Sequence, residues 1–313
     1  MSNISRFKKI VCPSCSENSN IVQKYCYSDK YENKEVTKYL DGRYKIYTCL
    51  DCEISFCSGI SKKNLDNYYK SIYKDQNRNL KPSRFSEFNS RFFSQVLFFI
   101  NHDKLKENLN VLELGPNNQG VLPTLRIFQK KINYYYFEQN NINYNYKNMV
   151  KLGEYFDPNK SALPKVDLIW ISHSLEHIHP DDLKKMLTCF YESLNIGGKI
   201  FIEIPNEFKS KTLYFPHTLF FSKKGLCKLF ENNHFHIIAA SEIYQSRIEK
   251  QQKYKIIIKK KLIQKIYLFI QNIYLFIQNF LPDNFVKKFA FRNFVLNGPT
   301  VNSQILRVIV EKR

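Results

Sequence analysis

Four short apolar runs, separated by stretches with helical periodicity, constrain the fold of this chain of 313 residues more than any other feature. The runs are NVLELG (110–115), INYYYFE (132–138), VDLIWISHS (166–174) and KIFIEIPN (199–206). Helices are expected between and after them, at 121–131, 181–194 and 223–231. Continuous apolar strands that alternate with helices are typical of a parallel sheet covered on both faces. The sequence therefore predicts an α/β domain.

Two more strand candidates, 234–244 and 304–312, are separated by a segment too long for a structureless loop. We therefore expect helices within 246–300, where IYLFIQN occurs twice in succession. Three interpretations of this insert compete: a helical hairpin packed on the domain or on a second subunit, a peripheral membrane contact through 255–292, and nucleic-acid binding. Its apolar run contains Gln and Asn and ends at Pro282, so we expect no transmembrane span.

The composition excludes a disordered chain, because 43% of the residues are hydrophobic and 15% are aromatic. The formal net charge is +20, from 48 Lys and Arg against 28 Asp and Glu. Charge is nearly balanced between residues 101 and 244, so the basic excess lies at the two ends. Most of the basic residues are lysine, whereas arginine is the usual reader of phosphates and base edges. We interpret the charge as a solvated surface, with attraction to phosphate or membrane as the alternative.

Four cysteines form two C-x-x-C pairs, and the pairs are typical of a zinc site. Cys12 and Cys15 form the first pair, and Cys49 and Cys52 the second. Four thiolates can surround one zinc ion tetrahedrally, and such a closed site is structural. The alternatives are four unrelated buried cysteines, or ligand exchange with the nearby Cys26 and Cys57. Because no apolar leader precedes Cys12, we expect a cytoplasmic protein.

The first apolar run ends in VLELGPNNQG (111–120), an acidic residue followed by a turn rich in Asn and Gly. Such a turn lets a ligand approach the backbone closely. The next strand ends in Glu138, and a carboxylate at that place can accept hydrogen bonds from both hydroxyls of a ribose. Strand, small-residue loop, helix, strand and acid together indicate a nucleoside-binding half-sheet.

On these residues the chain resembles the class I S-adenosylmethionine-dependent methyltransferases, over about 105–245 and the last strand. VDLIWISHSLEHIHPDD (166–182) is similar to the family's fourth-strand motif, LNIGGKIFIEIPN (194–206) to its fifth strand, and HTLFFSKKGLCKLFENNHFHI (217–237) to the closing segment. In the first loop, Glu113 and Gly115 match the family motif. Asn117 stands in place of the second glycine, and Gly120 comes one residue late.

The resemblance implies a Rossmann-like doubly wound sheet with an N-terminal zinc ribbon and a helical insert before the last strand. We expect a zinc ribbon at 1–60, a helical linker or lid at 61–108, with a helix at 85–100, and a methyltransferase domain at 109–313. A zinc ribbon ahead of such a domain resembles enzymes that methylate sugars and other components of cell-surface glycans.

The resemblance also implies the site residues. The cofactor-binding candidates are Glu113, Gly115, Asn117, Gly120, Glu138, Asp157 and Ser174, with Glu154 an alternative to Asp157 at the adenine. The catalytic candidates are His217, His177 and His173, because histidine can take a proton from an acceptor hydroxyl near neutral pH. His217 is preferred as the base, while His177 is as readily structural. At the end of the fifth strand, Glu203 either holds acceptor hydroxyls or caps a helix.

The sequence-based hypothesis is thus methyl transfer from S-adenosylmethionine to a sugar or to a cell-surface glycan precursor, which includes lipid-linked acceptors. Two alternatives remain open. An RNA methyltransferase would use the cysteine module and the basic ends to grip RNA. A non-catalytic methyltransferase-like partner protein would explain the altered glycine loop at Asn117 and Gln119.

Overall fold

The computed structural model describes residues 10–26, 44–70, 87–116, 120–139, 146–208, 216–243 and 305–313. Asn117 and the predicted helical insert at 246–300, which includes the segment 255–292 considered for membrane contact, lie outside these residues. Within them, no helix is both long and apolar enough to cross a membrane.

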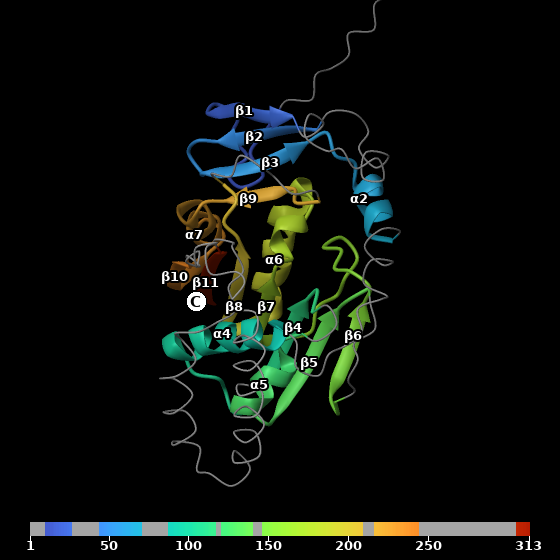
Figure 1. Ribbon diagram of the computed structural model, residues 1–313, viewed down its shortest axis with the longest axis vertical. Coiled ribbons are helices and arrows are strands. Elements are labelled where there is room, and N and C mark those ends of the chain that lie inside the picture. The colour runs from blue at the N-terminus through green and yellow to red at the C-terminus, as the bar shows by residue number, and fades with distance from the viewer. Residues whose placement is uncertain are drawn as a thin grey trace, which may run out of the picture.

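The centre of the molecule is a seven-stranded sheet in the order β10-β11-β8-β7-β4-β5-β6 (Figure 1). Five neighbouring strands run parallel, whereas β11 is antiparallel to both β8 and β10. The strands are β4 (Leu109–Leu114), β5 (Ile132–Phe137), β6 (Met149–Gly153), β7 (Val166–Ser172), β8 (Leu194–Pro205), β10 (Phe235–Ile243) and β11 (Ile305–Lys312). The mostly parallel sheet confirms the predicted α/β, Rossmann-like fold.

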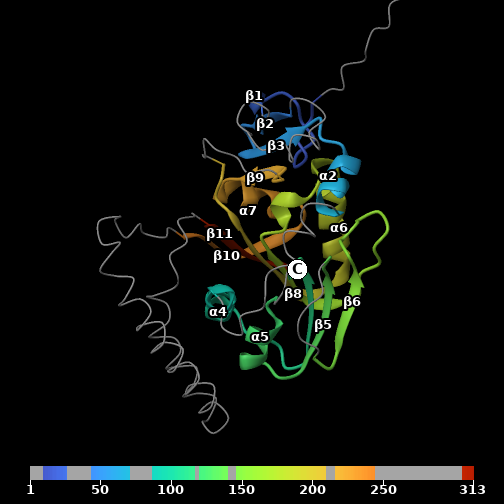
Figure 2. The same ribbon diagram turned by 45° about the vertical axis from the view of Figure 1, so that its right-hand side comes forward.

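Helices cover both faces of this sheet, because successive apolar residues of each strand point to opposite faces. On β7, Leu168 and Trp170 pack with α4 (Glu87–His102) and α5 (Leu122–Phe128). Ile169 and Ile171 pack on the other face with α6 (Leu183–Ser193) and α7 (Lys223–Glu231). Figure 2 shows α4 and α5 together on one side of the sheet, with α6 on the other. All seven residues of β7 are buried, as its continuous apolar run predicts.

The predicted helices agree with the structure to within a few residues at their ends. The segment expected at 85–100 is α4, the one expected at 121–131 is α5, and the one at 223–231 is α7. The segment expected at 181–194 is α6, preceded by the short 3-10 turn η4 (Pro180–Asp182). Ser222 caps the N-terminus of α7 by accepting a hydrogen bond from Gly225 N–H at 2.9 Å.

A second sheet joins the cysteine-rich module to the part of the chain that forms the large sheet. Its order is β1-β2-β3-β9, from β1 (Ile21–Cys26), β2 (Lys45–Cys49), β3 (Ile54–Ser58) and β9 (Leu219–Phe221). β3 pairs antiparallel with β9, and Cys57 N–H donates to the carbonyl of Thr218 at 2.9 Å. Figure 1 shows this sheet beyond one end of the central sheet. The sequence did not predict that β9 joins this module.

The strand order reverses at the centre of the large sheet, where β4 has β5 on one side and β7 on the other. Ligands of open α/β sheets bind outside the carboxyl ends of the strands at this switch point. Gly115 follows β4 there with φ of +63°, and His173 follows β7 with φ of +53°. The fold thus directs attention to one edge of the sheet.

Candidate functional site

A cavity of about 520 Å³ opens at the carboxyl ends of β4, β5 and β7. Gly115, Glu138 and Ser174 line it from the large sheet. The cavity is also lined by the short helix α2 (Lys62–Tyr68), which follows the cysteine-rich module. Leu65 of α2 and its C-cap residue Tyr69 belong to this lining. The two parts of the chain therefore share one cavity.

The position after β4 favours glycine because its backbone is left-handed and the segment after β7 approaches it closely. Gly115 has a left-handed backbone, and a Cβ there would lie 2.8 Å from the hydroxyl of Ser174. That hydroxyl donates to the carbonyl of Leu114 at 2.8 Å, which ties the ends of the two strands together. Four predicted cofactor residues, Gly115, Glu138, Asp157 and Ser174, line the cavity, and so does the alternative Glu154.

Glu113 and Gly120 lie behind the cavity wall rather than in it. The Glu113 carboxylate accepts a hydrogen bond from Val121 N–H at 2.8 Å and another from the Tyr134 hydroxyl. These bonds hold the start of α5 against β4. Burial raises the pKa of Glu113 to about 7 against the lowering effect of these two hydrogen bonds.

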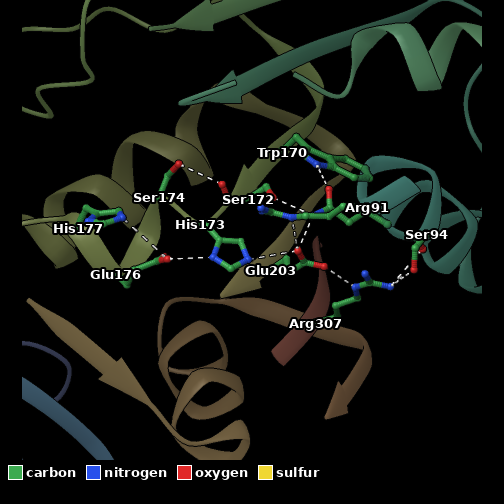
Figure 3. Close-up of polar contacts among 11 residues, drawn as sticks. Arg91, Ser94, Trp170, Ser172, His173, Ser174, Glu176, His177, Glu203 and Arg307 are labelled. Carbon is green, nitrogen blue, oxygen red and sulfur yellow. Dashed lines mark hydrogen bonds and ion pairs between the residues drawn. The ribbon is translucent and has the colours of Figure 1, made fainter. Parts of the chain in front are cut away.

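The residue at the end of β8, Glu203, is the centre of a buried ionic network (Figure 3). One carboxylate oxygen accepts from Arg91 Nε at 2.9 Å and from Gln95 Nε2 at 2.6 Å, both on α4. The other oxygen accepts from Arg307 Nε of β11 at 2.6 Å. Although burial alone would raise the pKa of Glu203, His173 and the two guanidinium groups hold it well below its usual range. The network ties α4 to two neighbouring strands.

His173 lies between two buried carboxylates. Its Nε2 is 3.4 Å from Glu203 and its Nδ1 is 3.6 Å from Glu176, as Figure 3 shows. Its backbone N–H donates to the carbonyl of Glu203 at 2.8 Å. Left-handed backbone is uncommon for a residue with a side chain and is found often at functional sites. Here it places an imidazole on the cavity wall.

The short 3-10 turn η3 (Leu175–His177) brings Glu176 and His177 next to His217, which precedes β9. Glu176 is 2% exposed, and burial raises its pKa. Burial, with His217 and His173 nearby, lowers the pKa of His177 well below its usual value, which favours the neutral form of this imidazole. His217 Nδ1–H donates a hydrogen bond to the Glu207 carboxylate at 2.7 Å. Burial lowers the pKa of His217, but this hydrogen bond and the charges of Glu176 and Glu207 raise it overall.

The three predicted catalytic histidines are therefore neighbours. The His177 and His217 ring centroids are 4.7 Å apart, and His173 reaches Glu176 from the other side. His173 and His177 line the cavity beside Ser174. His173 and His177, but not His217, thus line the same cavity as Gly115 and Glu138, an arrangement that suits transfer of a group between two bound molecules.

Residues 84–244, about half of the chain, match the family model of the methyltransferase domain. This chain belongs to the methyltransferase-domain family. A Burkholderia thailandensis 1,6-didemethyltoxoflavin N1-methyltransferase, solved with S-adenosylhomocysteine, is similar to it with 12% identity and a TM-score of 0.51. The match covers 88% of this chain and 97% of the other.

Two other solved structures are more distant. Bradyrhizobium japonicum NodS, an N-methyltransferase solved with S-adenosylhomocysteine, has 11% identity and a TM-score of 0.47 over 79% of this chain and 99% of its own. A putative methyltransferase in complex with the Haloferax volcanii Trm112 activator has 11% identity and a TM-score of 0.46 over 79% of this chain and 96% of its own. No curated protein sequence matches the chain.

The methyltransferase carries a second cluster, in its cysteine-rich module. The sulfur atoms of Cys12, Cys15, Cys49 and Cys52 lie within 4.8 Å of one another. Ser14 N–H points to the Cys12 sulfur at 3.4 Å, a knuckle-type contact. Four thiols from two C-x-x-C turns fit the tetrahedral ligand set of structural zinc. Cys57 is separate: it is buried in β3, and its thiol faces the carbonyl of His217 at 3.7 Å.

Sequence reasoning about the methyltransferase missed three residues of the site. Arg91 and Arg307 neutralise Glu203, and Glu207 holds His217. Glu207 follows β8 in IPNE, at the edge where ligands bind, so its position was a usable signal. The arginines gave no such signal, because one lies on α4 and the other near the end of the chain, far from Glu203 in sequence.

Proposed function

We propose that this protein transfers a methyl group from S-adenosylmethionine to a hydroxyl of a sugar or of a cell-surface glycan precursor. The observation that carries the proposal is the single cavity that runs from Glu138 to His173 and His177. Family membership supports the reaction class. The acceptor class is inferred because a cysteine-rich module joined to a methyltransferase domain resembles enzymes that methylate sugars and other components of cell-surface glycans.

On the cofactor side, Glu138 would accept hydrogen bonds from the ribose hydroxyls, and the backbone at Gly115 would approach the amino-acid part of the cofactor. Asp157 or Glu154 would hold the adenine amino group, and Ser174 would lie nearest the methyl group. All five residues line the cavity. When bound, the cofactor supplies a methyl group activated by a sulfonium, so the protein must mainly orient the acceptor and exclude water.

On the acceptor side, the histidine cluster would help the acceptor hydroxyl lose its proton, with His217 contributing most. Its ring is oriented by Glu207 and contacts His177, which lines the cavity. We further propose that Cys12, Cys15, Cys49 and Cys52 bind structural zinc. Because β3 of that module pairs with β9, the zinc site would steady the segment that carries His217.

Calorimetric titration with S-adenosylhomocysteine tests the cofactor site. We expect binding by the wild type, and an increase in Kd of about 10- to 100-fold in Glu138→Ala, because hydrogen bonds to a charged group contribute about 1.5–3 kcal/mol. Glu107→Ala, at a side chain 82% exposed, is the matched control and should bind like the wild type. Absence of binding by folded wild-type protein would contradict the proposal.

The acceptor side is tested by His217→Ala in methyl-transfer assays with a panel of sugar acceptors. Turnover should fall by about 100-fold or more, the usual contribution of proton transfer, while the Kd for S-adenosylhomocysteine stays near the wild-type value. Equal losses in turnover and in cofactor affinity would assign His217 a structural role instead. Zinc content measured on wild type and Cys49→Ser checks the metal assignment.

A further inference from the structure

Glu176, His177 and His217 form a compact cluster that the cofactor site does not use. One ligand-type atom of each residue lies within 4.8 Å of the other two. Glu176 and His177 belong to the turn η3, whereas His217 precedes β9, so a tertiary contact brings them together. The backbone reinforces it, because Thr218 N–H donates to the carbonyl of Glu176 at 2.8 Å.

The cluster has unsatisfied acceptor atoms in a buried place. Among the described residues, neither carboxylate oxygen of Glu176 has a hydrogen-bond partner, and nor has Nδ1 of His177. An ionised carboxylate can only accept, and a neutral imidazole has one nitrogen with a lone pair. Buried polar atoms are nearly always paired, so three such atoms in one cluster call for an explanation.

The two arginines and His173 do not supply the missing hydrogen-bond partner. Arg91 and Arg307 both bind Glu203. His173 is 3.6 Å from Glu176, outside hydrogen-bond distance, and is also directed to Glu203. A cation bound among Glu176, His177 and His217 could reach one ligand-type atom of each residue.

We propose that Glu176, His177 and His217 bind a divalent transition-metal ion at the acceptor end of the cavity. Two imidazoles and one carboxylate are a common ligand set for Zn²⁺ and for Fe²⁺, and they leave coordination positions open. The contact between His217 Nδ1 and Glu207 supports the assignment. A carboxylate that holds one nitrogen of a ligand histidine fixes the ring, so that Nε2 can bind the metal.

This inference rests on the proposed function and deepens it. His177 and His173 both line the cavity, so a metal ion at the cluster would lie beside the place of the acceptor. An open position on the ion would bind the acceptor hydroxyl oxygen and lower the pKa of that hydroxyl. The site therefore favours an acceptor with an oxygen ligand, such as a sugar hydroxyl. In this arrangement His217 acts through the bound ion instead of taking the proton directly, and His173, which is not among the three ligands, takes the proton.

Cobalt binding separates this site from the cysteine cluster. The full chain is purified with its cysteine site loaded with zinc and is titrated with Co²⁺, followed by visible absorption. We expect one added equivalent of Co²⁺, with d–d bands but without thiolate-to-cobalt charge transfer. Glu176→Gln and His217→Asn should lose this equivalent. Glu207→Gln should weaken it by about 10- to 100-fold, the usual effect of losing the partner of a ligand histidine.

His179→Asn is the matched control. His179 also lines the cavity, but its two nitrogens already contact the carbonyl of Ile60 at 3.0 Å and the N–H of Asp181 at 3.2 Å. This variant should bind Co²⁺ like the wild type. Circular dichroism and the Kd for S-adenosylhomocysteine, measured on every variant, verify that the variants are folded.

The metal site is overturned if the wild type binds no Co²⁺ outside the cysteines, or if the Glu176 and His217 variants bind it as tightly as the wild type. The cofactor titration distinguishes this failure from failure of the proposed function. Protein that binds S-adenosylhomocysteine and transfers methyl groups, but not Co²⁺, retains the function and loses only the metal site.

Discussion

Two buried glutamates lie on either side of His173, and their surroundings are opposite. Glu203 accepts hydrogen bonds from two arginines and a glutamine, whereas Glu176 accepts none from the described residues. Both are almost completely buried, at 0% and 2% exposure. Their distances to the same imidazole are nearly equal, 3.4 and 3.6 Å. Burial alone therefore does not determine the role of a carboxylate in this protein.

The different surroundings of Glu203 and Glu176 indicate different roles for the two carboxylates at this edge of the sheet. Glu203 connects α4, β8 and β11 through charged hydrogen bonds, which fixes the wall behind His173. Glu176 lies on a short turn next to the cavity, with its lone pairs still available. A carboxylate whose partners are all protein groups stabilises the fold, whereas a buried carboxylate without such partners needs an explanation, and the metal ion proposed above is ours for Glu176.

The largest effect is expected at Glu203. In Glu203→Ala, Arg91 and Arg307 lose their buried counterion, so the free energy of unfolding should fall by about 3–5 kcal/mol. Urea denaturation measures this change. Glu311→Ala, which removes a half-exposed partner of Lys199, should cost less than about 1 kcal/mol. Equal losses in the two variants would remove the contrast between Glu203 and an ordinary surface acid.

Glu113 provides an intermediate case, since one of its oxygens accepts two hydrogen bonds and the other has no partner among the described residues. Burial raises its pKa from 4.5 to about 7, so the folded protein retains this proton after the unfolded chain has lost it. The protonated Glu113 therefore stabilises the folded state at low pH. Its contribution to the free energy of unfolding decreases by at most about 3 kcal/mol as the pH rises from about 4.5 to 7, and it does not return above that range.

Glu113→Gln should remove this pH-dependent loss. The measurement is the free energy of unfolding of wild type and variant, without cofactor, between pH 5 and about 8, the range that spans the raised pKa. The difference between the two curves isolates Glu113 from the other titrating groups. A constant difference across this range would mean that Glu113 is ionised throughout.

The smallest change in stability is expected at Glu176. In medium without added transition metals, Glu176→Gln should raise the free energy of unfolding by about 1 kcal/mol, because a neutral amide is easier to bury than a carboxylate without partners. Thermal and urea denaturation measure it. A decrease in the free energy of unfolding as large as that of Glu203→Ala would mean that protein groups already bind the Glu176 carboxylate. The contrast between Glu176 and Glu203 would then be wrong.

The sequence predicted six of the seven strands of the central sheet, all except β6, because their signals are local. A continuous apolar run such as 166–172 must be buried between two layers of helices. Glu138 is the residue directly after its strand, so its place at the edge of the sheet can be predicted from the sequence. Four predicted cofactor residues line one cavity for the same reason: the carboxyl ends of neighbouring parallel strands meet at one edge. The gathering of His173, His177 and His217 also follows from strand and turn positions.

Features that depend on distant pairs were not predictable from the sequence. The Glu203 network needs Arg91 and Arg307, which are separated from it by more than 100 residues on each side. Glu113 matches the family motif, yet its side chain binds Val121 and Tyr134 instead of lining the cavity. A single sequence gives residue types and spacing, but not which of two polar groups a buried carboxylate will meet.

The pairing of β3 with β9 has a consequence for how the chain is made and handled. The cysteine-rich sheet is completed by a strand that leaves the ribosome long after the other three, so its final pairing must wait for most of the large domain. A shortened protein lacking residues 1–60 would leave β9, with its Leu-Phe-Phe sequence, as an unpaired edge. Exposed apolar edges recruit other strands. Removal of the module should therefore produce aggregation rather than a smaller, soluble enzyme.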